Sequence, residues 1–124
     1  MKRDQLILAD YLEHIQEAIT SIVSYVEDVD EVGFLNNRMM KDAVIRNFEI
    51  IGEASNNIRK HYPEFVESNP DLPFLTAYQM RNALAHGYFK VDYEIVWKAI
   101  SRDLPPLYIK IQQVLDGLRP SMTD

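Results

Sequence analysis

The stretch from Asp4 to Glu27 reads DQLILADYLEHIQEAITSIVSYVE and sets the architecture expected for the rest of the chain. Its apolar residues recur at intervals of three and four, which is the spacing of one face of an α-helix. Charged and polar side chains such as Asp10 and Glu13 lie away from this face. The stretch therefore predicts a long amphipathic helix that buries one side, formed by Leu8, Leu12, Ile15, Ala18, Ile19, Ile22, Val23 and Val26.

The same helical spacing returns along the rest of the chain. A second long helix is predicted over 36–61, a shorter third one from Pro73 to His86, and a fourth that begins near Asp92, a residue suited to cap a helix. Their buried faces are predicted to be Val44, Phe48, Ile51, Ser55 and Ile58; then Phe74, Ala77, Met80, Ala83 and Leu84; then Ile95, Val96, Trp97, Ala99 and Ile100.

The connections between these helices carry acids, glycine or proline. We expect loops at 28–33 and 62–73, with one short turn allowed in the second, and an interruption at 103–106 where two prolines start a final helix. That helix has an apolar stripe of Leu107, Ile111, Val114, Leu115 and Leu118. With no strand-like alternation, the sequence predicts an all-α protein, an antiparallel bundle of four to five helices.

Length and composition agree with one globular domain over residues 1–124. Hydrophobic residues make up 47% of the chain and charged residues 26%, which is ordinary for a protein with a real core. The chain has no cysteine, no HExxH pair and no carboxylate-rich metal motif, so we expect neither a metal nor a cofactor. No leader pattern or membrane-length apolar run is present, which predicts a soluble cytoplasmic protein.

The formal net charge of −6 bears on possible partners. Proteins that bind nucleic acid without selectivity carry a basic surface, and this chain has no basic excess overall. The charge argues against broad binding to duplexes. It fits a small selective site, which would need a local basic groove, or a basic protein partner.

The chemistry is concentrated in residues 81–88, which read RNALAHGY. This stretch carries a guanidinium, an amide, an imidazole and a phenol. It lies where the third helix is predicted to end, because Gly87 suits the position just after a helix C-terminus. Asn82 and His86 are four residues apart and share a helix face, whereas Arg81 and His86 diverge by about 140°. A loosened helix end, the length of the arginine, or a second copy of the motif in a symmetric dimer would have to bring them together.

Each residue of this motif also has an ordinary interpretation. A histidine at a helix end can simply stabilise the helix dipole, an arginine can be a solvated surface residue, and a tyrosine after glycine can be packing. Together, however, Arg81, Asn82 and His86 supply what cleavage of a phosphodiester needs. These needs are charge stabilisation, orientation and proton transfer near neutral pH.

A polar stripe on the second helix leaves two alternatives open. Its members are Asp42, Arg46, Glu49, Glu53, Asn56 and Asn57. The stripe can be a solvated face with weak ion pairs. Alternatively it faces the Arg81–His86 end and supports the substrate there, with Arg46 contacting phosphate and Glu53 holding a basic side chain.

The spacing Arg81-x4-His86-x-Tyr88, with Asn82 after the arginine, resembles the signature of the HEPN superfamily. In this form it is similar to the HepT-like branch, the toxin half of type II toxin–antitoxin pairs. The stretch RNFEIIGEA at 46–54, Trp97 and the Asp103-Leu104-Pro105 region also resemble that branch. The resemblance implies a HEPN-like bundle that acts on RNA.

The resemblance also implies a partner. In that branch a minimal nucleotidyltransferase antitoxin can transfer AMP to the tyrosine of the motif, which is Tyr88 here. The reaction that fits the residues is metal-independent attack of an RNA 2′-hydroxyl on the adjacent phosphate. His86 would transfer protons, Arg81 would hold phosphate oxygens and Asn82 would orient His86 or the substrate. Two His86 copies meeting in a homodimer would divide the acid and base roles.

Two alternatives to a nuclease remain at this point. The chain could be a noncatalytic helical subunit that docks on a nucleotidyltransferase and holds a nucleotide with Arg81, His86 and Tyr88. It could also be a purely structural bundle. The acidic net charge favours the noncatalytic subunit, whereas the complete motif favours the nuclease.

Overall fold

The computed structural model describes the backbone of residues 3–86 and 91–123, and the side chains of residues 3–84 and 91–118. Within these residues the chain forms helices and no strand, which confirms the all-α prediction. The helices are α1 (Arg3–Val26), α2 (Glu31–Leu35), α3 (Arg38–His61), α4 (Pro63–Ser68), α5 (Phe74–His86), α6 (Tyr93–Arg102) and α7 (Leu104–Thr123).

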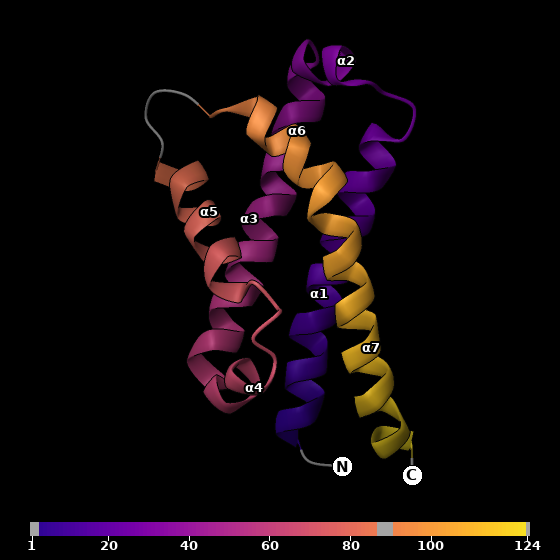
Figure 1. Cartoon of the computed structure of the whole chain (residues 1–124), viewed down its shortest axis with the longest axis vertical. Coiled ribbons are helices and arrows are strands. Elements are labelled where there is room, and N and C mark those ends of the chain that lie inside the picture. The colour runs from indigo at the N-terminus through magenta and orange to yellow at the C-terminus, as the bar shows by residue number, and fades with distance from the viewer. Residues whose placement is uncertain (1–2, 87–90, 124) are drawn as a thin grey trace.

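The long helices run antiparallel to their neighbours in sequence. Figure 1 shows α1 rising, α3 descending, α5 rising again, and α6 and α7 descending together. The most extensive packing is between α3 and α5 and between α1 and α3, while α7 packs on α1. Helix α3 is therefore the centre of the bundle, and α5 is attached mainly through it.

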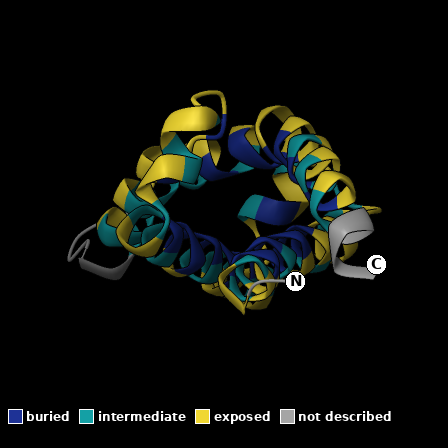
Figure 2. Ribbon diagram, turned by 90° about the horizontal axis from the view of Figure 1, so that it is seen from below, coloured by how far each residue is buried: buried dark blue, intermediate teal, exposed yellow. Residues whose placement is uncertain are grey.

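The apolar stripe of α1 provides much of the core. Leu12, Ile15 and Ile22 are fully buried, and their counterparts on the facing helices include Val44 and Ile111. Figure 2 shows the buried faces of the long helices turned toward one another. The stripe is narrower than predicted, because Val23 near the end of α1 is exposed, as is Ile95 on α6.

Polar caps begin three of the helices. The side chain of Asp30 accepts a hydrogen bond from the Gly33 amide at 2.8 Å, that of Asn37 from the Met40 amide at 3.0 Å, and that of Asp92 from two amides of α6. Such caps satisfy amides that have no partner inside the helix. The predicted start of α6 at Asp92 is confirmed.

Two short helices lie where the sequence predicted loops. Helix α2 is capped by Asp30 and anchored by Phe34, whose ring packs 5.2 Å from that of Trp97. Helix α4 begins at Pro63, whose fixed φ suits a first helical turn. Five or six residues are too few to show a helical period in sequence, so only their packing reveals them.

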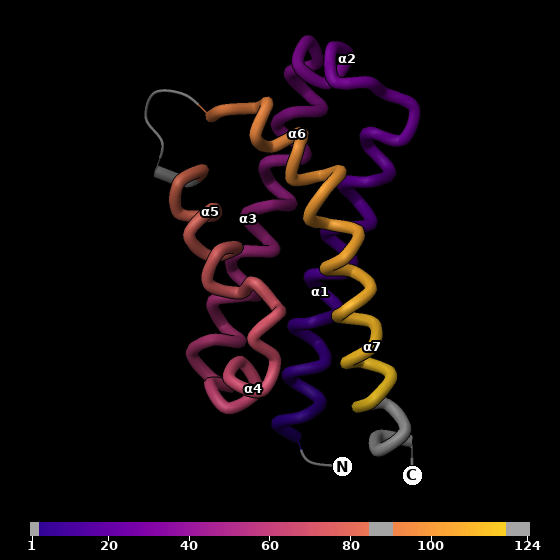
Figure 3. Tube along the Cα trace, viewed as in Figure 1, coloured from indigo at the N-terminus to yellow at the C-terminus, as the bar shows by residue number. Residues whose placement is uncertain are grey.

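The junction between α6 and α7 matches its prediction. Asp103 closes α6 with a backbone hydrogen bond to Ala99, and Leu104 starts α7 with Pro105 and Pro106 in its first turn. Prolines lack an amide hydrogen, so they are tolerated only where that hydrogen has no helical partner. The trace in Figure 3 shows α7 carrying on from α6 and returning to the end of the bundle where the chain begins.

Candidate active site at the α3–α5 contact

The first half of the 81–88 motif lies on the last two turns of α5. Arg81 and Asn82 are partly exposed, and the α-helical backbone continues to His86. The side chain of His86, and the whole of Tyr88, lie outside the described residues. Because α5 stays helical up to His86, unwinding before that residue does not bring Arg81 and His86 onto one face.

A glycine on α3 brings the two helices together at Arg81. A Cβ added at Gly52 would lie 2.8 Å from Cγ of Arg81 and 2.9 Å from the carbonyl oxygen of Ala77. Real Cβ atoms do not approach other atoms this closely, so only glycine permits the observed distance between α3 and α5. The position is buried in the middle of the packing that holds α5 to the bundle.

The prediction that Ala83 lies on the buried face of the third helix is wrong, because Ala83 is exposed. The residue that lets α3 and α5 approach closely was not predicted. The missed residue is Gly52. A signal for it existed, since glycine inside a helix weakens that helix and so usually has a packing reason.

Arg81 is held from two sides. Its Nη2 lies 2.6 Å from Oε1 of Glu53 on α3, and its Nη1 donates a hydrogen bond to Oδ1 of Asn82 at 3.0 Å. The Nε atom is buried and has no hydrogen-bond partner among the described residues. The side chain of Arg81 is 28% exposed and that of Glu53 51% exposed, so water reaches the pair.

This contact separates the two alternatives for the polar stripe. Glu53 crosses to α5 and holds Arg81, as expected if the stripe faces the motif. Arg46 instead lies 4.0 Å from Glu49 on its own helix, with 70% of its side chain exposed, as expected of a weak surface pair. The structure thus brings Glu53, Arg81 and Asn82 together and leaves Arg46 and the partly buried Glu49 outside this cluster.

The chemistry available at this cluster is electrostatic. A guanidinium has five N–H donors, and the two contacts to Glu53 and Asn82 leave others for an anion. A planar fork of donors suits the oxygens of a phosphate better than a single ammonium does. The carboxylate of Glu53 fixes the orientation of the Arg81 guanidinium.

Comparison with known proteins places the chain in a family. A model of the family described as Ribonuclease HepT-like, a branch of the HEPN superfamily, matches residues 15–114. The chain belongs to the HepT-like family. The predicted family and the helical HEPN fold are thereby confirmed.

Three relatives of this HepT-like chain illustrate the match. A protein of Thermococcus cleftensis, named as a probable ribonuclease HepT, is 39% identical over 85% of the chain and 93% of its own length. A protein of Methanocaldococcus jannaschii named as a candidate RNase is 36% identical over 84% and 93%. Another candidate RNase, from Caldanaerobacter subterraneus subsp. tengcongensis, is 33% identical over 85% and 91%. No solved structure matches the chain.

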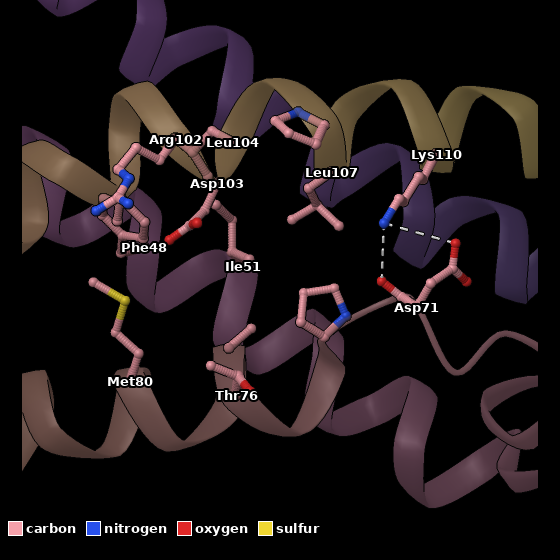
Figure 4. A pocket seen from close by; sticks show the side chains of 14 residues that line it. Phe48, Ile51, Asp71, Thr76, Met80, Arg102, Asp103, Leu104, Leu107 and Lys110 are labelled. Atoms are coloured by element: carbon pink, nitrogen blue, oxygen red, sulfur yellow. Dashed lines mark hydrogen bonds and ion pairs between the residues drawn. The ribbon is translucent and has the colours of Figure 1, made fainter.

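A separate cavity of this HepT-like fold lies beside the Gly52–Arg81 contact, since Ile51 and Ala77 line it. It encloses about 320 Å³ between α5, α3 and the α6–α7 junction, and it is lined by apolar side chains such as Phe48, Met80 and Leu107. Figure 4 shows Lys110 and Asp71 paired at one end, at 3.7 Å, and Asp103 near Phe48 at the other. Neither Arg81 nor Asn82 lines the cavity.

Two kinds of feature are absent from the described part of the HepT-like chain. Within it, no three histidine, aspartate or glutamate side chains gather as they would around a metal ion. None of the described helices is both long enough and apolar enough to cross a membrane. The Glu53–Arg81–Asn82 cluster is the candidate active site because it holds the charged side chain of the 81–88 motif in place.

Proposed function

We propose that this chain is the toxin of a toxin–antitoxin pair and cleaves single-stranded RNA without a metal ion. The observation that carries the proposal is the Arg81 guanidinium, which Glu53 and Asn82 hold at the helix end that carries His86. Membership of the HepT-like family and the names of its relatives support RNA as the substrate.

The proposed reaction is a transesterification within the RNA. A base removes the proton of a 2′-hydroxyl, whose oxygen forms a bond to the adjacent phosphorus while the bond to the 5′-oxygen breaks. An acid returns a proton to that oxygen, so the products are a 2′,3′-cyclic phosphate and a free 5′-hydroxyl. His86 performs the proton transfers, Arg81 stabilises the added charge on the phosphorane, and Asn82 fixes Arg81.

We further propose that two copies of the chain form the working enzyme. Arg81 and His86 point about 140° apart on a regular helix, so one copy does not gather them onto one face. A symmetric pair would place His86 of one copy near Arg81 of the other and divide the acid and base roles between two imidazoles. Arg46, 70% exposed and about two helical turns from Glu53 along α3, would contact a flanking phosphate.

The direct test is cleavage of a labelled single-stranded RNA in the presence of excess EDTA. We expect unchanged cleavage rates with and without the chelator, and fragments that end in a cyclic phosphate, because every proposed group belongs to the protein. Denaturing gels and end-group analysis give both readouts. Cleavage that stops in EDTA and returns with Mg²⁺ would contradict the proposed chemistry.

The proposal includes control through Tyr88 by a nucleotidyltransferase partner. Transfer of AMP to the phenol would place a negative charge and a bulky group close to the phosphate site, so RNA would be repelled. Protein produced together with its partner should gain mass in AMP-sized steps and lose cleavage activity. Tyr88→Phe should show no such gain and stay active. A wild-type protein that remains unmodified would count against this control.

A noncatalytic nucleotide-binding subunit is the second candidate function. The net charge of −6 and the occupation of Arg81 by Glu53 favour it, because both weaken attraction to RNA. Expression of the chain without its partner separates the two. Growth arrest accompanied by RNA fragments is expected of the nuclease, and normal growth is expected of the subunit.

A further inference from the structure

A second arginine bridges α3 and α5 near the Arg81 cluster. The guanidinium carbon of Arg59 lies 5.7 Å from the ring centroid of Tyr78, a cation–π contact. Both residues are partly exposed. Within the described chain Arg59 makes no ion pair, so its donors remain available to an anion. The contact holds an aromatic ring and a positive charge together at the surface.

The position of this pair follows from helix geometry. Tyr78 precedes Asn82 by four residues, so the two share a face of α5 and lie about 6 Å apart along its axis. Met80, which lines the cavity, is turned about 200° away from Tyr78. The Arg59–Tyr78 pair therefore lies on the same side of α5 as Asn82, one helical turn from the proposed phosphate site.

We propose that Tyr78 and Arg59 form a subsite that stacks the base of the nucleotide next to the cleaved phosphate. This inference rests on the proposed ribonuclease function and specifies its substrate as an RNA strand with unstacked bases. An aromatic ring accepts any base because every base has a flat π-face, and a nearby arginine adds attraction to the backbone. A local pair of this kind also explains how a chain of net charge −6 could hold RNA.

The experiment measures binding separately from cleavage. A fluorescently labelled RNA octamer is titrated into His86→Ala protein that carries Tyr78→Phe, Tyr78→Trp or Tyr78→Leu. Stacking needs a ring, so Phe and Trp should keep the affinity within about twofold, while Leu should weaken it about tenfold. Tyr108→Leu, an exposed tyrosine on α7 across the bundle, is the matched control and should change nothing.

Tyr78→Leu also distinguishes base stacking from packing, because leucine keeps apolar volume at the position but has no aromatic ring on which a base can stack. Affinity that is the same for Tyr78→Leu and Tyr78→Phe would overturn the subsite. Arg59→Met gives a second test that does not alter Tyr78. It should lower the affinity and make the binding less dependent on salt, since one contact to phosphate is lost. An unchanged affinity and salt dependence would overturn the role of Arg59.

The outcomes also distinguish this inference from the proposed function. With His86 restored, Tyr78→Leu should raise KM while kcat stays near the wild-type value, because stacking binds substrate without touching the reacting atoms. RNA that binds through Tyr78 but is never cleaved contradicts the nuclease and supports the subsite. Cleavage that does not depend on Tyr78 supports the nuclease and overturns the subsite. Absence of RNA binding overturns both.

Discussion

His86→Ala and Arg81→Ala should each reduce cleavage of single-stranded RNA at least about 100-fold. General acid–base groups contribute about 10²–10⁴ in rate, and a single group that stabilises transition-state charge contributes about 10²–10³. The fold should survive both changes, because water reaches the Arg81–Glu53 pair and the helical core does not depend on its charge. Initial rates on denaturing gels and circular dichroism spectra test these statements together.

Matched controls come from the same chain. His14 on α1 and Arg38 at the start of α3 are exposed, and His14→Ala and Arg38→Ala should cleave like the wild type. Glu53→Gln should lower the rate by less than Arg81→Ala does, since the amide keeps a hydrogen bond to Arg81 but loses the charge. In Arg81→Ala protein the same Glu53→Gln change should have no further effect. Wild-type rates in both His86→Ala and Arg81→Ala would end the nuclease proposal.

Gly52→Ala should destabilise the protein and disturb the active site together. The added methyl group would overlap Arg81 and the carbonyl of Ala77, so α5 must move away from α3. Overpacking of this kind costs about 1–3 kcal/mol, and it opposes the gain of about 1 kcal/mol that alanine normally brings to a helix. We therefore expect a lower melting temperature and slower cleavage, because the displacement of α5 also separates Arg81 from Glu53.

Gly117→Ala is the matched control for this prediction. Gly117 lies on the exposed side of α7, and a Cβ added there would meet no atom within 4 Å. Alanine should stabilise the protein by up to about 1 kcal/mol through helix propensity alone. Thermal and urea unfolding followed by circular dichroism measure both variants. Equal stabilisation by Gly52→Ala and Gly117→Ala would show that α3 and α5 do not need glycine at their contact.

Much of the helical framework could be predicted because its physical signals are local. The apolar period of α1 and α3, the capping aspartate of α6 and the prolines that begin α7 act within a few residues of their own position. The predictions are wrong where contacts between residues far apart in the sequence determine the structure. Helices α2 and α4 are too short to show a period, and Val23 and Ile95 are exposed although their spacing suggested burial.

The long helices, the family and the residue types of the motif can be read from the chain alone, since they depend on periodicity, caps and spacing. The contact of Glu53, rather than Arg46, with Arg81, and the role of Gly52 in setting the distance between their helices, follow from the folded arrangement. The cause is side-chain packing between helices. Which side chains meet across two helices depends on their rotation and separation, and these follow from the fit of the whole interface.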